Sequence, residues 1–269
     1  MKIIANHAHL MPPHTEDGNN RWPAGDADML LKHLDYCGID RAVIFPPFAC
    51  QVGHSMKDAN LWALRQVRMH PDRFIPAGTI FPLAKDILEM LNILHAEGIR
   101  LAKIHPSIDL HDIADPQAGA CYAKAEEYGI ALDYHTGPHG SRLAWADPKK
   151  YDDMAWDYPK LKLVFEHLGG RTYFEEFMAI LSNHKRGRIF GGLTSVLSYE
   201  THKMWYLGLE KIVSLVECAG ANTLIYGLDF PWNAAETNKR DIELVRSLTI
   251  SESDKERILG GNLASLLGL

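Results

Sequence analysis

The sequence predicts an α/β fold, a (β/α)8 TIM barrel that forms a single domain over residues 1–269. Short apolar segments alternate with longer amphipathic ones along the whole chain, which is the pattern of parallel strands joined by helices. No linker or low-complexity segment divides the chain, and its 269 residues suit one barrel of ordinary size. An open doubly wound sheet would show the same local pattern, so the polar residues at the strand ends have to decide between the two folds.

Eight short apolar segments, spread along the whole chain, are the predicted strands. They are Lys2–His7, Arg41–Pro46, Phe74–Phe81, Leu101–His105, Ala131–His135, Leu161–His167, Arg188–Leu193 and Thr223–Leu228. Eight is the number of strands in a closed barrel of this type.

The segments between the strands carry the start and stop signals of helices. Asp26 is expected to cap a helix that ends at Gly38, and Gly98 and Gly129 are expected to end later helices in the same way. Each of these glycines precedes an isoleucine at the junction between a helix and the next strand. Their separations of 60 and 31 residues fit a module of about 30 residues repeated around a barrel.

The composition excludes several classes of protein. Hydrophobic residues make up 46% and charged residues 23%, as in an ordinary globular protein. The net charge of −6 argues against a nucleic acid as partner, because phosphate contacts need a basic surface. The four cysteines form no CxxC pair, which speaks against a disulfide framework or a cysteine zinc site.

Location and partners follow from the absence of long apolar runs. No stretch approaches the roughly 18 apolar residues of a membrane span, and the N-terminus lacks the apolar run of a signal peptide. We therefore expect a cytoplasmic protein that acts on a small molecule and has no membrane or nucleic-acid partner. Self-association into a homo-oligomer is left open.

The first predicted strand ends in the tripeptide His7-Ala8-His9. Residues two apart in a strand point to the same side, so His7 and His9 can reach one metal ion together. Imidazole nitrogens are common zinc ligands, and a catalytic zinc site keeps one position open. Taken alone, two ordinary polar residues in a loop would give the same pattern.

Three further predicted strands end in a group that can bind a metal. His135 ends the fifth strand, His167 ends the sixth, and Asp229 follows the eighth. In a (β/α)8 barrel the carboxyl ends of all strands meet on one face, where the active site lies. Each residue alone could be an ordinary core or surface residue. Four strands that each end in a metal-competent group favour the barrel over the open sheet and predict a metal site.

Five motifs carry a resemblance to a known family: HAH at 7–9, YHTG at 134–137, EHLGG at 166–170, GLDFPW at 227–232 and ILGGNLASLLGL at 258–269. Over essentially its whole length the chain resembles the amidohydrolase superfamily, in the amidohydrolase-2 branch of aminocarboxymuconate-semialdehyde decarboxylase and related metal-dependent hydrolases. The resemblance implies one divalent cation, Zn²⁺ or alternatively Mn²⁺, held by His7, His9, His135 and Asp229. It also implies that His167 lies beside the metal-bound water and that a closing helix follows the GN dipeptide.

Two positions depart from that branch. Its usual aspartate two residues before the first histidine is Ala5 here, and its usual serine before the last aspartate is Leu228. Neither change removes a ligand. The first weakens the support that neighbouring groups are expected to give the ligands.

Three residues are predicted to bind the substrate. Lys103 and His105 end the fourth strand in the segment LAKIHP, and Arg171 follows the glycine pair of EHLGG. In two-metal amidohydrolases such a lysine is carbamylated and bridges the metals, whereas in the one-metal branch it would bind an anionic group of the substrate. Arg171 is either a partner for a carboxylate or phosphate or a solvated helix residue.

The remaining histidines fall into two groups. Polar residues in loops that could cover the pocket are His14, His54, His111, His139 and Arg142. Histidines expected in helices, to which we assign no role, are His33, His70, His95, His184 and His202.

These residues predict a metal-dependent hydrolase that cleaves an ester, lactone or amide of a small carboxylated substrate. The cation would activate water. His167 would act as a base or stabilise the oxyanion, and Asp229 would carry a proton to the leaving group. Non-oxidative decarboxylation of an aromatic or unsaturated carboxylic acid, a carboxy-lyase reaction, is the alternative, although such enzymes of this branch generally have longer chains. A non-catalytic metal-binding barrel is the third possibility.

Overall fold

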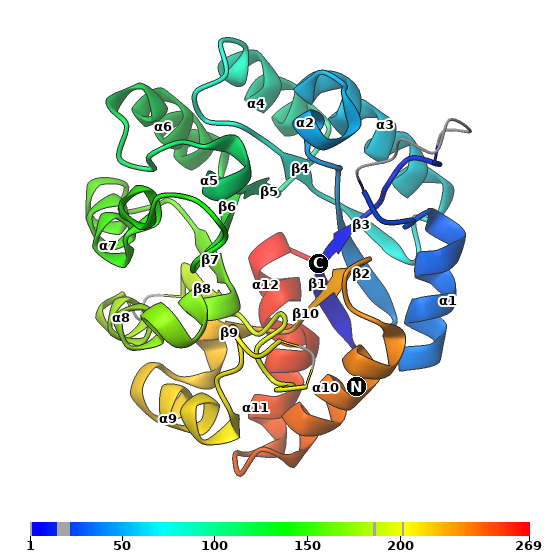
Figure 1. Cartoon of the computed structure of the whole chain (residues 1–269), viewed down its shortest axis with the longest axis vertical. Coiled ribbons are helices and arrows are strands. Elements are labelled where there is room, and N and C mark those ends of the chain that lie inside the picture. The colour runs from blue at the N-terminus through cyan, green and yellow to red at the C-terminus, as the bar shows by residue number, and fades with distance from the viewer. Residues whose placement is uncertain (1, 15–21, 185–186, 201) are drawn as a thin grey trace.

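The computed structural model describes residues 2–14, 22–184, 187–200 and 202–269. It is a closed ring of parallel strands inside a ring of helices, as Figure 1 shows in a view into the barrel. The predicted (β/α)8 barrel is therefore confirmed. Within the described residues no helix is long and apolar enough to cross a membrane.

The eight predicted strands are present, and two of them are interrupted. The strands are β1 Ile4–His9, β2 Arg41–Phe45, β3 Phe74–Pro76, β4 Gly78–Thr79, β5 Leu101–Ile104, β6 Ala131–His135, β7 Leu163–Glu166, β8 Ile189–Gly192, β9 Leu224–Ile225 and β10 Gly227–Phe230. Hydrogen bonds join them in the orders β10-β1-β2-β3 and β4-β5-β6-β7-β8-β9. Only Ala77 separates β3 from β4 and only Tyr226 separates β9 from β10, so the chain itself closes the ring.

The helices follow the strands in the expected order. Their bounds are α1 Ala27–Cys37, α2 Ala49–Val52, α3 Met56–Met69, α4 Ile87–Ala96, α5 Pro106–Asp109, α6 Gly119–Tyr128, α7 Pro148–Asp157, α8 Gly170–Asn183, α9 Leu209–Ala219, α10 Ala235–Ser247, α11 Glu252–Glu256 and α12 Asn262–Leu267. The side chain of Asp26 accepts a hydrogen bond from Met29 N at 2.9 Å, as predicted for a cap. Gly38, Gly98 and Gly129 all have positive φ, which suits the end of a helix.

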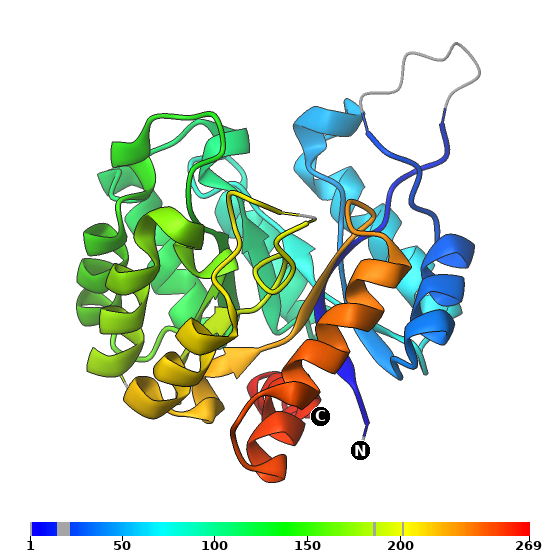
Figure 2. The same ribbon diagram turned by 60° about the horizontal axis from the view of Figure 1, so that its bottom comes forward.

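The last helix closes the amino-terminal end of the barrel. On α12, Leu263 and Leu266 pack against inward-facing strand residues such as Val43 and Val164. Asn262 Nδ2 fixes the start of this helix by donating to the carbonyls of Ala221 and Leu224, each at 2.7 Å. Figure 2 shows α12, in red, at the end of the molecule where both termini lie. The opposite end, formed by the carboxyl ends of the strands, is left for a site.

Candidate active site

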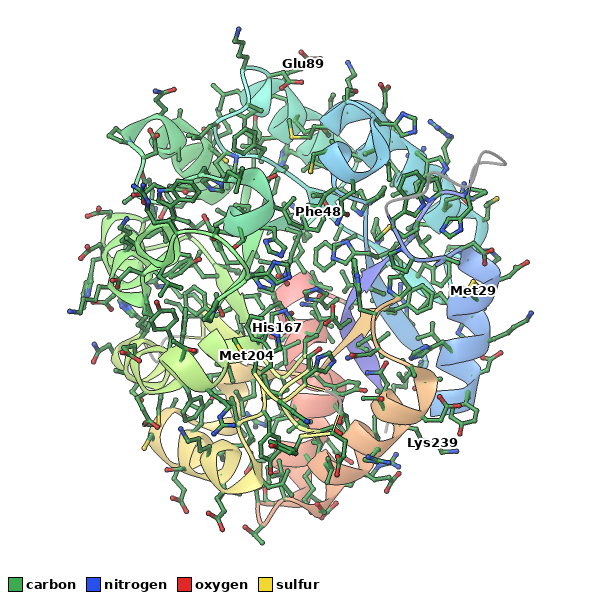
Figure 3. All side chains as sticks on the ribbon, in the orientation of Figure 1. Met29, Phe48, Glu89, His167, Met204 and Lys239 are labelled. Carbon is green, nitrogen blue, oxygen red and sulfur yellow. The ribbon has the colours of Figure 1, made fainter. Side chains whose placement is uncertain are left out.

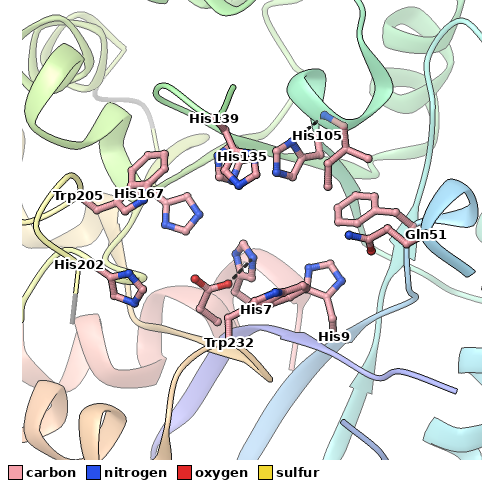
Figure 4. Close-up of a pocket in the computed structure, with 13 residues that line it drawn as sticks. His7, His9, Gln51, His105, His135, His139, His167, His202, Trp205 and Trp232 are labelled. Atoms are coloured by element: carbon pink, nitrogen blue, oxygen red, sulfur yellow. Dashed lines mark hydrogen bonds and ion pairs between the residues drawn. The ribbon is translucent and has the colours of Figure 1, made fainter. Parts of the chain in front are cut away.

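A pocket of about 230 Å³ opens at the carboxyl ends of the strands. Histidines, aromatic rings and one carboxylate dominate its wall. It is lined by His7, His9, Phe48, Gln51, His105, Ile108, His135, His139, His167, His202, Trp205, Asp229 and Trp232. No lysine or arginine of the described chain lines it. Figure 4 shows His105, His135 and His139 on one side of the space and His7 and His9 on the other.

The structure brings the predicted ligands and the predicted catalytic histidine together. His7, His9, His135, His167 and Asp229 come from four different strand ends and all line this pocket. Their rings contact one another: the His7 centroid lies 5.3 Å from that of His9 and 5.4 Å from that of His167. Figure 3 shows His167 near the centre of the barrel, whereas Met29, Glu89 and Lys239 lie at the periphery of the molecule.

Unusual backbone angles turn three of these side chains into the pocket. The φ angles of His7, His167 and Asp229 are 63°, 65° and 58°. Residues with a Cβ rarely adopt this left-handed region, and such residues cluster at functional sites. At His7 the unusual φ angle coincides with a shift in the register of β1. Against β10, this shift falls between Asn6 and Ala8. A regular strand would have pointed this side chain in a different direction.

The spacing of His7 and Asp229 suits a shared cation. His7 Nε2 lies 3.5 Å from Asp229 Oδ1. Two atoms that each lie about 2.1 Å from a tetrahedral ion are about 3.4 Å apart. The two atoms are therefore placed as neighbouring ligands of one ion would be.

Hydrogen bonds leave imidazole lone pairs free at the pocket. His9 Nδ1 lies 3.1 Å from the carbonyl of Pro46, and His167 Nδ1 lies 2.9 Å from the carbonyl of Thr194. Because a carbonyl can only accept, both rings carry their proton on Nδ1 and keep a lone pair on Nε2. His135 Nε2 is buried and has no hydrogen-bond partner in the described chain. A buried nitrogen of this kind calls for a partner such as a metal ion.

Burial keeps these imidazoles neutral. It is the main cause that lowers the pKa of His7 and His135 well below the usual value and that of His9 to about 4. The pKa of His167 is lowered for the same reason. Neutral imidazole is the form that binds a metal or accepts a proton, so all four rings are in that form at neutral pH.

Asp229 is held ionised by its neighbours. Burial opposes its ionisation, but the facing imidazoles of His7 and His167 and the hydroxyl of Ser195 outweigh burial, and its pKa is about 2. The Ser195 hydroxyl donates to Oδ2 at 2.7 Å, which leaves Oδ1 toward His7. Three neutral imidazoles and one carboxylate are a donor set that fits a divalent cation.

In the described chain, the side chains whose potential ligand atoms all lie within 4.8 Å of one another form two groups of three: His105 with His135 and His139, and His7 with Asp133 and Glu166. The predicted set of four is neither of these groups. Each of the two groups has a feature that disfavours a bound cation. His105 Nδ1 accepts from the backbone of Ile108 at 3.3 Å, so its neutral ring carries the proton on Nε2 and presents a donor. In the second group a cation is already present, because Lys103 Nζ lies 2.8 Å from Asp133 Oδ1.

Glu166 supports His7 from below the pocket. Its Oε2 lies 3.4 Å from His7 Nδ1, and Asn6 and Thr194 donate hydrogen bonds to its two oxygens. A Cβ at Gly192 would overlap this carboxylate, so the glycine makes room for it. The family usually has an aspartate two residues before its first histidine, where this chain has Ala5. In this chain, the carboxylate beside His7 is that of Glu166, which comes from another strand.

The three predicted substrate residues have different positions. His105 lines the pocket, and its ring stacks on His135 at 3.8 Å between centroids. Lys103 is fully buried, does not line the pocket, and forms an ion pair with Asp133 beneath it. Arg171 is exposed at the start of α8 and does not line the pocket either. Of the three, only His105 is in a position to touch a ligand there.

The expectation that His202 lies in a helix is wrong. This residue lies in the loop between β8 and α9 and lines the pocket. It is hydrogen bonded to Asn233 Oδ1, Asn233 donates to Ser195 Oγ at 3.1 Å, and Ser195 donates to Asp229. The segment around it, TSVLSYETHKMWY, has no regular apolar spacing, and this irregularity could have identified a loop. His139, expected in a loop, also lines the pocket.

The chain matches one protein family and resembles several solved structures. The family model described as amidohydrolase matches residues 4–269. No curated protein matches the sequence. An uncharacterized TIM-barrel protein of Bordetella bronchiseptica is 20% identical, with a TM-score of 0.77 and coverage of 100% of this chain and 99% of that chain.

Two further solved structures bear the names of enzymes. A putative 2-pyrone-4,6-dicarboxylic acid hydrolase of Pseudomonas putida is 17% identical, with a TM-score of 0.74 and coverage of 99% and 97% of the two chains. A dihydroxybenzoic acid decarboxylase of Polaromonas, with bound manganese and the inhibitor 2-nitroresorcinol, is 14% identical, with a TM-score of 0.71 and coverage of 100% and 97%. At these identities the structures show a common fold. The match of the family model over nearly the whole chain shows that the protein belongs to the amidohydrolase family, in its amidohydrolase-2 branch.

Proposed function

We propose that this protein is a metal-dependent hydrolase that cleaves an ester, lactone or amide bond of a small, planar, carboxylated substrate. One observation carries the proposal. His167 lines the pocket, and its Nδ1–H is bonded to the Thr194 carbonyl, so its Nε2 keeps a lone pair that can accept a proton. Hydrolysis needs a base beside the attacking water, whereas decarboxylation needs an acid to protonate the carbon that loses CO2.

The cation would be held by His7, His9, His135 and Asp229. The free Nε2 atoms of His9 and His135 and the pairing of His7 with Asp229 support this assignment. Zn²⁺ is the expected ion, and Mn²⁺ is the alternative, as in the decarboxylase of Polaromonas. When bound, such an ion polarises a carbonyl group and lowers the pKa of water.

His167 and Asp229 would move the protons. His167 Nε2 can accept a proton from the attacking water, because its Nδ1 is committed to the Thr194 carbonyl. That bond also fixes the plane of the ring. The carboxylate of Asp229, held by Ser195 through Oδ2, would relay this proton toward the leaving group.

The walls of the pocket favour a flat substrate. Trp205 contacts His167 at 4.8 Å between ring centroids, and Trp232 contacts His9 at 5.4 Å. His105 offers its Nε2–H as a donor to a carboxylate or carbonyl oxygen. The name of the Pseudomonas putida neighbour, a hydrolase of a pyrone dicarboxylic acid, is consistent with this substrate class.

Decarboxylation of an aromatic or unsaturated acid is the second candidate. The Polaromonas neighbour is named a decarboxylase, and the two tryptophans give the pocket an apolar wall against which a carboxylate could be lost. In this chain the reaction would require His167 or Asp229 to be protonated in the complex.

One panel tests both reactions. The metal-loaded protein is incubated with aryl esters, carboxylated lactones and hydroxybenzoic acids, with proton release and CO2 release measured in parallel. We expect proton release from a lactone or ester without CO2. Release of CO2 alone would replace the proposal with a carboxy-lyase, and no turnover across the panel, with metal bound, would favour a non-catalytic barrel.

A further inference from the structure

A second cavity, of about 150 Å³, lies beside the histidine pocket and shares Phe48 with it. Two short helices contribute to both cavities. On α2, Gln51 lines the histidine pocket and Cys50 lines the second cavity. On α5, Ile108 lines the first and Asp109 the second. The two cavities are therefore neighbours, and the Phe48 side chain forms the partition between them.

The partition is part of the candidate active site. The Phe48 ring lies 5.2 Å from that of His9 and 5.4 Å from that of His105, between ring centroids. Figure 3 shows Phe48 between α2 and the centre of the barrel. A ligand bound against these histidines would therefore reach the second cavity when this ring turns aside.

One carboxyl oxygen of a residue in the wall of the second cavity lacks a hydrogen-bond partner. The polar side chains of Asn60 and Thr79 are already satisfied: Asn60 Nδ2 donates to the Thr79 carbonyl at 2.8 Å, and Thr79 Oγ1 donates to the Pro46 carbonyl at 3.0 Å. Asp109 Oδ2 is buried and has no hydrogen-bond partner in the described chain. The rest of the wall is mainly apolar, with residues such as Phe81.

A buried carboxyl oxygen without a hydrogen bond is costly, and native proteins rarely keep one without a use. Burial raises the pKa of Asp109 to about 7, and the backbone hydrogen bond at His105 offsets this effect only in part. A hydroxyl or ammonium group of a ligand would supply the missing hydrogen bond. The apolar wall would cover the short chain that carries this group.

We propose that the second cavity is a subsite for the far end of the substrate, an apolar arm that ends in a hydroxyl or ammonium group bound by Asp109. The proposal rests on the proposed function for the carboxylated end, and it narrows the substrate class. Phe48 is then the residue that determines whether a substrate with such an arm is accepted.

The rate at which Cys50 is alkylated can show whether this cavity is occupied, without any measurement of catalysis. The Cys50 thiol lies in the wall near Asp109, and alkylation by iodoacetamide at alkaline pH can be followed peptide by peptide in the mass spectrometer. Cys218 is the internal control, since it is exposed, as Cys50 is, but does not line the cavity. The probes are benzoate, 4-propylbenzoate, 4-(3-hydroxypropyl)benzoate and 4-(3-aminopropyl)benzoate, added to the metal-loaded full chain.

We expect the hydroxyl and amino probes to protect Cys50 at about tenfold lower concentration than the propyl probe, the usual effect of a hydrogen bond to a charged group. Benzoate should leave Cys50 unprotected, and Cys218 should react at the same rate throughout. Asp109→Leu should remove the advantage of the polar probes and keep the protection by the propyl probe. Phe48→Leu should lower the protecting concentration of all three arm-bearing probes.

The failure of the proposed function can be separated from that of the subsite. If calorimetry detects no binding of benzoate, the carboxylate pocket is wrong, and propanol and propylamine then test the cavity alone. Protection of Cys50 by these small probes, lost in Asp109→Leu, would still support the subsite. No protection by any arm-bearing probe, or equal protection in Asp109→Leu, would overturn it.

Discussion

Replacing Glu166 with glutamine should weaken metal binding although it removes no ligand. The Glu166 carboxylate lies 3.4 Å from His7 Nδ1 and accepts hydrogen bonds from Asn6 and Thr194. In Glu166→Gln an NH2 group replaces one of these oxygens, so one of the two donors loses its acceptor. The negative charge beside the ring of His7 is lost as well, which makes this imidazole a weaker and less firmly oriented ligand.

The size of the effect follows from this geometry. Partners that support a metal ligand typically change metal affinity by about 10- to 100-fold, or about 1.4–2.7 kcal/mol. The distance of 3.4 Å between His7 and Glu166 is long for a hydrogen bond, so we expect the lower end, about tenfold. Competition for Zn²⁺ with a chromogenic chelator measures the affinity directly and does not depend on turnover.

Two variants make the test specific. A Cβ at Gly192 would overlap Glu166 Oε2, so Gly192→Ala should displace the carboxylate and reproduce the loss. Glu89 lies on the surface in an ion pair with Lys57, and Glu89→Gln should leave the affinity unchanged. Wild-type affinity in both Glu166→Gln and Gly192→Ala would refute the role of the buried carboxylate.

Three further predictions concern individual histidines. His167→Ala should keep its metal and lose about 10²- to 10⁴-fold in kcat, the contribution of a positioned base; complete metal loss would make it a ligand. His7→Ala should lose the metal by elemental analysis, whereas His33→Ala, whose ring bonds to Asn238 away from the pocket, should retain it. Burial lowers the pKa of His111 to about 4, so the folded state gives up stability as pH falls from 6.5 toward 4. His111→Phe should remove up to about 3 kcal/mol of that pH dependence of unfolding, and an unchanged slope in urea titrations would contradict this.

The strand ends made most of the site predictable. His135, His167 and Asp229 each end a recognisable apolar segment, and the barrel then brings the carboxyl ends together whatever their separation in sequence. The backbone turn at His7 was beyond prediction, because it depends on a shift of register against two neighbouring strands.

Other features depend on contacts between distant segments. The periodicity of β5 indicates that Lys103 and His105 share a side, but the depth of Lys103 follows from its register partner Asp133 on β6. Arg171 follows a turn at Gly170, with φ of 59°, whose direction the sequence leaves open. Asn233 and Ser195 meet across 38 residues of sequence, and no local pattern signals such a pair.

The metal content of the purified protein tests the central claim most directly. After loading with Zn²⁺ or Mn²⁺ and removal of free ions, elemental analysis should give about one equivalent per chain, with an unmodified Lys103 by mass spectrometry. The ion pair between Lys103 and Asp133 is the reason to expect an unmodified lysine. Two equivalents with a carbamylated Lys103 would contradict the one-metal site. No bound metal under any loading condition would contradict the account as a whole.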